Sequence, residues 1–135
     1  MIQFFFEDVK EIKIDSSTIS WLQNLIVNEQ KKLGKITYIF KSDEGLLKVN
    51  REFLQHDYYT DIITFDYVKG KTLSADIYVS LHRISENAQI GDNNFNKELH
   101  RVLAHGILHL CGYNDKTHEQ QKEMTQMEDY YLTLL

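Results

Sequence analysis

The sequence predicts a single α+β domain spanning residues 1–135, in which a mixed sheet of about four strands carries about five helices. A length of 135 residues is typical of one domain, and a hydrophobic content of 42% is ordinary for a folded globular protein. Short strand-like segments are interspersed with longer segments in which apolar residues recur at helical spacing. The sequence shows no internal repeat and no Pro-rich linker that would divide these segments into two domains.

The first third of the chain is expected to form a strand, a helix and a second strand. Ile2–Phe6 is a short apolar run typical of a strand. Ser16 or Ser17 is suited to cap a helix that should end near Gly34, a residue type common after a helix C-terminus. Residues 35–40 have a large apolar side chain at every second position, which indicates the second strand.

The middle of the chain is expected to add one helix and two strands. The helix begins at the polar run that starts with Ser42, and its apolar residues extend to Leu54. A polar, aromatic loop follows at residues 55–61, and a buried type of strand follows at residues 62–65. After a turn, residues 73–79 alternate between apolar and polar side chains, which indicates a strand with one polar face.

Three further helices are expected in the second half of the chain. The first occupies about residues 80–89 and ends before a Gly-Asp-Asn-Asn turn. Asn94 is suited to cap the next helix, which Gly112 should end. Thr117 and Gln120 have the spacing of a capping box, which predicts the start of the last helix.

The composition argues against several kinds of protein. Fifteen Lys and Arg residues against 20 Asp and Glu give a net charge of −5, unlike a strongly basic nucleic-acid-binding domain. The single cysteine, Cys111, excludes an internal disulfide framework and a Cys-rich zinc site. No stretch resembles a secretory signal or a membrane-spanning helix. We therefore expect a cytoplasmic protein with no membrane partner.

The fourth predicted helix carries residues with the spacing of metal ligands. His105 and His109 are four residues apart, so both imidazoles leave the same helix face about one turn apart. Gly112 lets the chain turn back, which places Asp115 where a third ligand could approach. Two imidazoles and one carboxylate leave a coordination position for water, as in catalytic zinc sites. We therefore expect one zinc ion at these three residues, with catalysis through the water it binds.

Two alternatives to this site stay open. His118, in the first turn of the last predicted helix, is a rival third ligand. The histidine pair also resembles the His-Glu-x-x-His motif of zinc peptidases, but Gly106 stands where those enzymes carry the glutamate that acts as general base. The pattern therefore fits metal-activated water better than ordinary proteolysis.

The segment around the histidine pair resembles the YbeY endoribonucleases, also called rRNA maturation factors. Other parts of the chain are similar to this family in consistent order, at residues 50–53, 60–65 and 75–80. The family signature His-Gly-x-Leu-His-Leu-x-Gly-Tyr is matched at His105, Gly106, Leu108, His109, Leu110, Gly112 and Tyr113.

The resemblance implies a single-strand-specific, zinc-dependent endoribonuclease that acts in small-subunit rRNA 3′-end maturation and in ribosome quality control. The implied partners are single-stranded or ribosomal RNA and the small ribosomal subunit with its associated proteins. Two positions depart from the family pattern. Asp115 stands where the family usually has a third histidine, and Leu54 stands where it often has an arginine associated with RNA and catalysis.

Four residues are candidates for contacts with RNA. Arg51, one turn before Leu54, and Lys48 could contact phosphates. Asp76 lies on a strand that borders the cleft in the YbeY family, and the Tyr113 ring could stack on an unpaired base. The competing functions are a zinc peptidase-like hydrolase and a non-catalytic ribosome-associated binding protein. The acidic net charge and the absence of the family's arginine keep the binding protein in consideration.

Overall fold

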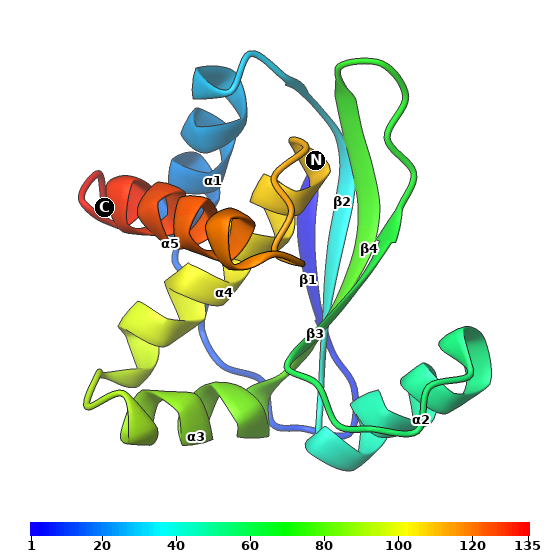
Figure 1. Cartoon of the computed structure of the whole chain (residues 1–135). Coiled ribbons are helices and arrows are strands. Elements are labelled where there is room, and N and C mark those ends of the chain that lie inside the picture. The colour runs from blue at the N-terminus through cyan, green and yellow to red at the C-terminus, as the bar shows by residue number, and fades with distance from the viewer.

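The computed structural model describes all residues, 1–135, as one four-stranded mixed sheet with five helices (Figure 1). The strand order is β1-β2-β4-β3; β1, β2 and β4 run parallel, and β3 is an antiparallel edge strand. The predicted α+β class is therefore confirmed. The elements are β1 (Ile2–Phe6), α1 (Ser16–Asn28), β2 (Lys32–Lys41), α2 (Asp43–Leu54), β3 (Ile62–Asp66), β4 (Thr72–Ser80), α3 (Leu81–Ile90), α4 (Phe95–Leu110) and α5 (His118–Leu132).

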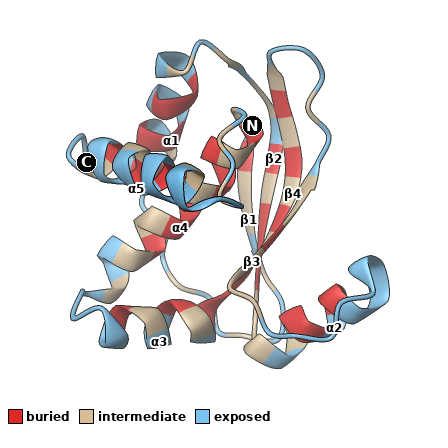
Figure 2. Ribbon diagram, viewed as in Figure 1, coloured by how far each residue is buried: buried red, intermediate tan, exposed pale blue.

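The main core lies between the sheet and the helices on one of its faces. Helices α1, α3, α4 and α5 gather on this side, while α2 lies on the other (Figure 1). Apolar residues of β4 alternate with polar ones along the strand, and Ile77 and Val79 are fully buried in a cluster of 23 residues. A second, small cluster joins α2 to the opposite face through Leu46, Val49 and Ile63. The outer surface of α2 remains exposed (Figure 2).

Most of the expected helix starts are confirmed. Ser42, Ser80 and Asn94 each accept a hydrogen bond from a backbone N–H in the first turn of α2, α3 and α4. The capping box of Thr117 and Gln120 is present at the start of α5. These side chains satisfy amide groups that have no partner inside the helix. No helix is both long and apolar enough to cross a membrane.

The ends of α1 differ from the prediction. Asp15 rather than Ser16 or Ser17 occupies the N-cap position, and its side chain makes no capping hydrogen bond. The helix stops at Asn28, and Gln30 adopts the left-handed conformation with a φ of 60°. A non-glycine residue therefore makes the turn that we expected near Gly34.

Gly34 instead lies inside β2, which begins at Lys32, earlier than predicted. A Cβ atom at this position would come within 2.3 Å of the Ser74 hydroxyl and 2.8 Å of the Leu73 carbonyl. The pairing register between β2 and β4 also shifts between Leu33 and Ile36. The glycine is needed here because the neighbouring strand approaches closely at an irregular step of the sheet.

Candidate metal centre

The C-terminal half of α4 brings the two predicted histidines together. The Nε2 atoms of His105 and His109 lie 3.0 Å apart. After the helix, Gly112 adopts a φ of 108°, which favours glycine, and the chain turns back toward the helix. This turn places Asp115 Oδ2 3.4 Å from His105 Nε2 and 3.3 Å from His109 Nε2. The three side chains therefore form a group that could hold a metal ion.

Glu128 of α5 orients His105 from the opposite side of the ring. Its Oε2 atom lies 2.5 Å from His105 Nδ1, and its Oε1 atom accepts a hydrogen bond of 2.9 Å from Arg101. The Glu128 residue is only 6% exposed, although it carries a charge. A buried carboxylate needs such partners, and a carboxylate that accepts from a histidine fixes the direction of the other ring nitrogen.

The backbone after α4 orients His109 in the same way. His109 Nδ1 lies 2.9 Å from the carbonyl oxygen of Tyr113 and donates a hydrogen bond to it. The Tyr113 hydroxyl in turn donates to Glu29 at the end of α1, over a distance of 2.8 Å. Glu29 also accepts a hydrogen bond from the Tyr131 hydroxyl. The turn that carries Asp115 is thus tied both to α4 and to α1.

This donor set fits a cation. Because a hydrogen on each Nδ1 satisfies the acceptor beside it, both Nε2 atoms present lone pairs toward the Asp115 carboxylate. Ligand nitrogens of a tetrahedral zinc ion, bound at ~2.0–2.1 Å, lie roughly 3.3 Å apart, close to the separation of the two Nε2 atoms. Burial lowers the pKa of His105, but Glu128, Asp115 and Asp61 outweigh it and raise the pKa above its usual value. The surroundings therefore favour a positive charge at this point.

The metal group opens into an acidic recess between α4, α5 and β3. A cavity of about 480 Å³ is lined on one side by His105, His109 and Asp115 and on the other by β3 and the residues before it. A smaller adjoining recess contains Glu98 and Glu128. Asp61 borders both cavities. Arg101 is the single Lys or Arg residue in either lining, and it is already paired with Glu128 and Asp129.

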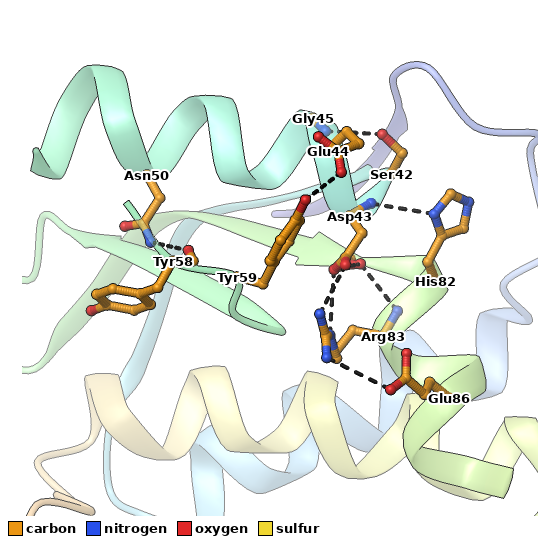
Figure 3. A network of polar contacts seen from close by, with 11 residues as sticks. Ser42, Asp43, Glu44, Gly45, Asn50, Tyr58, Tyr59, His82, Arg83 and Glu86 are labelled. Atoms are coloured by element: carbon orange, nitrogen blue, oxygen red, sulfur yellow. Dashed lines mark hydrogen bonds and ion pairs between the residues drawn. The ribbon is translucent and has the colours of Figure 1, made fainter. Parts of the chain in front are cut away.

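Side chains of α2 and α3 hold the loop at residues 55–61, which ends at Asp61 (Figure 3). The buried Asn50 donates to the Tyr58 carbonyl over 2.9 Å, and the Tyr59 hydroxyl donates to Glu44. Arg83 of α3 lies 5.8 Å from the Tyr59 ring centroid and donates to Asp43 at the start of α2. The Asp61 carbonyl finally accepts a hydrogen bond from the Ser80 amide, 3.0 Å away. Contacts from α2 and α3 thus position this side of the recess.

The structure separates His118, Arg51 and Lys48 from the metal group. His118 is an exposed residue at the start of α5 and does not belong to the ligand group. Arg51 and Lys48 lie on the exposed surface of α2, and Arg51 forms an ion pair with Asp57. Neither lines the metal recess.

The remaining candidates have different surroundings. Asp76 lies on the face of the sheet opposite α4, because its neighbours Ala75 and Ile77 point into the core. Tyr113 contributes its carbonyl to His109, while its ring packs against the core and its hydroxyl contacts Glu29. Cys111 also packs against the core rather than joining the ligands, and burial raises the pKa of its thiol to about 12.

The sequence did not predict a place at the site for two residues, Glu128 and Asp61. Glu128 lies 23 residues beyond His105, on a helix whose pattern gave only packing positions. The sequence did offer one signal. Glu128 falls on the same helix face as the buried Met124 and Tyr131, and a charged residue on a buried face indicates a specific polar partner. Asp61 falls in the segment at residues 60–65 that resembles the YbeY family, but nothing in its local spacing predicts a place in the recess.

The chain is similar to known proteins over nearly its whole length. A family model described as Endoribonuclease YbeY matches residues 4–135. A Parabacteroides distasonis protein named Endoribonuclease YbeY is 45% identical over 135 residues, covering 99% of this chain and 95% of that protein. A Bacteroides thetaiotaomicron protein of the same name is 50% identical over 117 residues, covering 87% and 85% of the two chains.

The likeness extends to three dimensions. The solution structure of TM1509 from Thermotoga maritima superposes with a TM-score of 0.71 at 31% identity, covering 98% of this chain and 87% of that one. The match of the family model spans the histidine pair, Asp115 and the strands that border the recess. The chain therefore belongs to the YbeY endoribonuclease family.

Proposed function

We propose that this protein is a zinc-dependent endoribonuclease that cleaves single-stranded RNA. Its role would be 3′-end maturation of small-subunit rRNA and ribosome quality control in the cytoplasm. The observation that carries the proposal is the convergence of His105, His109 and Asp115 at the wall of an open recess. Membership of the YbeY family supports RNA as the substrate.

The three ligands would hold the zinc ion, and Glu128 and the Tyr113 carbonyl would keep both imidazoles aimed at it. When bound, zinc supplies a Lewis acid that activates water and offsets negative charge on a phosphoryl group. Asp115 adds a negative charge that a third histidine would not carry. The bound water should therefore be less acidic than at a site with three histidines.

The acidic lining has a consequence for the substrate. Asp61, Glu98 and Asp115 repel a phosphodiester, and the single arginine of the lining is paired with carboxylates. RNA should therefore enter the recess only when a cation occupies the ligand group. Phosphate contacts that position the rest of the strand must come from outside the recess, where Arg51 and Lys48 on α2 are the proposed residues.

The packing of Gly106 disfavours a peptidase. The Cβ of any larger residue here would lie 3.1 Å from Ile77 Cδ1 and 3.3 Å from Ile62 Cδ1, both belonging to the sheet beneath α4. A glutamate at this position would push its side chain into the core rather than toward the ligand group. The helix therefore lies too close to the sheet to carry the general base of the zinc peptidase motif.

The direct test compares the wild-type chain with His109→Ala, each purified, treated with chelator and reloaded with zinc. We expect the zinc-loaded wild type to cut single-stranded RNA internally and to leave a perfect duplex of the same sequence intact. Chelator should remove the activity and added zinc should restore it, while His109→Ala stays inactive under all conditions.

Two outcomes would contradict the proposal in different ways. Equal cleavage by His109→Ala would show that the metal group is not the source of the activity. Zinc-dependent binding of RNA without cleavage would instead support a non-catalytic ribosome-associated protein. In cells, deletion of the gene should leave precursor 3′ ends on small-subunit rRNA, and the wild-type chain but not His109→Ala should restore the mature ends.

A further inference from the structure

A second recess lies on the face of the sheet opposite the metal group. Its volume is about 160 Å³, and its lining is almost entirely aromatic. Phe53 is 65% exposed and Tyr67 54% exposed, although large aromatic side chains are costly to leave in water. The residues that line it are Phe53 from α2, Phe65 and Tyr67 from β3 and the segment after it, and Asp76 and Tyr78 from β4.

The rings of this recess lie edge to face and are not stacked in parallel. The Phe65 ring stands nearly perpendicular to Phe53, at 83°, and to Tyr78, at 82°. The centroid separations are 6.1 and 5.8 Å. Faces and edges of several rings therefore border one space, which suits a flat aromatic ligand that can stack on one wall and meet the edge of another.

One carboxylate stands among these rings. Asp76 is the direct cross-strand partner of Phe65, so both side chains leave the same face of the sheet. Asp76 Oδ2 accepts a hydrogen bond of 3.2 Å from the Tyr67 hydroxyl, and no Lys or Arg nitrogen forms an ion pair with Asp76. The recess thus combines aromatic walls with an acceptor that has no ion-pair partner.

We propose that this recess binds a guanine base of the RNA strand that the metal centre cleaves, a role that rests on the proposed function above. Guanine presents N1–H and the N2 amino group side by side, and a carboxylate can accept from both. Adenine and cytosine place a ring acceptor beside their amino group, which would face the negative charge of Asp76. Uracil offers one N–H between two carbonyl acceptors.

Strand β3 connects this recess to the metal group. Ile62, Thr64 and Asp66 line the metal recess, whereas Phe65 and Tyr67 line the aromatic one. Side chains of a strand alternate between the two faces of a sheet, and β3 is the edge of this sheet. An RNA strand that crosses this edge places its backbone at the metal and a base a few nucleotides away in the aromatic recess. Cleavage would then occur at a fixed distance from a guanine.

The test uses the zinc-loaded full chain and short 2′-O-methyl oligonucleotides, which report binding without cleavage. One oligonucleotide contains a single guanine in a uridine background, a second has inosine at that position, and a third has only uridine. We expect the guanine oligonucleotide to bind about 10-fold more tightly than the inosine one, because inosine lacks the N2 amino group and a good bidentate contact gives roughly 5–150-fold discrimination.

Substitutions in the recess should either remove this preference or weaken the binding of both purines. Asp76→Asn replaces one acceptor oxygen by a donor amide of similar size, and Phe65→Leu removes a stacking wall. Asp76→Asn should bring guanine and inosine oligonucleotides to equal affinity, whereas Phe65→Leu should weaken both by a similar factor, because guanine and hypoxanthine stack alike. Zinc content and uridine binding should stay unchanged in both variants. Asp92→Asn, at an exposed turn between α3 and α4, is the matched control and should keep the preference. Tyr67→Phe should reduce the preference less, because it removes only a donor to Asp76.

The outcomes separate this proposal from the proposed function. If the wild type binds all three oligonucleotides equally but cuts ordinary single-stranded RNA, the guanine site is overturned and the nuclease stands. If the preference survives Asp76→Asn, and Phe65→Leu binds both purine oligonucleotides as tightly as the wild type does, the base is read elsewhere and the recess is overturned. If guanine is preferred through Asp76 but no RNA is cut, the guanine site stands and the nuclease does not.

Discussion

Two segments place a carboxylate at the metal recess, and they are held in different ways. The turn at residues 111–115 follows α4 and carries Asp115, while the loop at residues 55–61 follows α2 and carries Asp61. Each begins where a helix ends and contains a left-handed residue, Gly112 in the first and Gln55 in the second. The two segments therefore look alike locally but differ in what fixes them.

The turn after α4 is fixed largely by its own neighbours in sequence. The Tyr113 carbonyl accepts from His109, four residues earlier, and Gly112 supplies the backbone conformation that the turn requires. The loop after α2 depends instead on Asn50, Glu44 and Arg83, the last of which comes from a different helix. The first segment is therefore part of a local motif, and the second is assembled by tertiary packing.

The largest effect is expected when a histidine is removed from the local motif formed by α4 and the turn after it. His109→Ala should lower zinc from about one ion per chain to almost none, because it removes one of the three proposed ligands. Thermal unfolding in the presence of chelator should change little, since His109 is part of the recess wall and not of the core. Metal analysis of purified protein measures the first effect. His118→Ala is the control and should keep its zinc, whereas loss of zinc in that variant but not in Asp115→Ala would identify a different third ligand.

The second effect tests the contact from α5 to the same motif. Glu128→Gln keeps the shape of the side chain but removes the charge that orients His105, and should weaken zinc binding by about 10–100-fold. Competition with a zinc-binding dye would measure this change. Asp129→Asn also removes a partner of Arg101 but does not contact His105, so it should leave zinc affinity unchanged. Equal effects of the two variants would show that only the arginine pairing matters.

The third prediction concerns a substitution that loosens the loop at residues 55–61 and leaves the turn after α4 unchanged. Asn50 is 1% exposed and donates to the Tyr58 carbonyl, so Asn50→Ala removes this hydrogen bond together with the packing of a buried side chain. The free energy of unfolding should fall by about 1–3 kcal/mol in urea denaturation. Zinc affinity should stay the same, because none of the three proposed ligands lies on this loop. A matching loss of zinc affinity would mean that the two segments are coupled.

A smaller effect sharpens the comparison within the first segment. Tyr113 and Tyr131 donate to the same Glu29 carboxylate, but only Tyr113 belongs to the turn beside the ligands. Tyr113→Phe and Tyr131→Phe should each lower the free energy of unfolding by about 1 kcal/mol. Only Tyr113→Phe should also weaken zinc binding, by a few-fold. If both variants weaken it equally, Glu29 rather than the turn transmits the effect.

The smallest effect concerns Arg51, which lies on exposed α2 beside the loop. Arg51→Ala should change the free energy of unfolding by less than about 0.5 kcal/mol, because exposed ion pairs contribute little. If Arg51 contacts a phosphate, the salt dependence of single-stranded RNA binding should lose roughly 0.7 from its slope. Fluorescence anisotropy over a salt series measures this, and an unchanged slope would place the phosphate contact elsewhere.

Residue types and short spacings were enough to predict much of the molecule. The caps at Ser42, Ser80 and Asn94, and the ligand spacing of α4, depend on residues within one turn of each other. The alternating pattern of β4 likewise follows from the two-residue period of a strand. In each case the chemistry that determines the structure lies within a few residues and can be recognised before the chain folds.

Only the tertiary structure decided the features that join distant segments. Glu128 reaches His105 across 23 residues, and Glu29 reaches Tyr113 across 84. Gly34 looked like a helix terminator, but a neighbouring strand requires it inside β2. These roles depend on which side chains come into contact when helices and strands pack. Spacing along the chain does not predict such contacts. The grouping of His105, His109 and Asp115 was therefore predictable from local spacing, whereas Glu128, which orients His105, and Asp61, which borders the recess, were not.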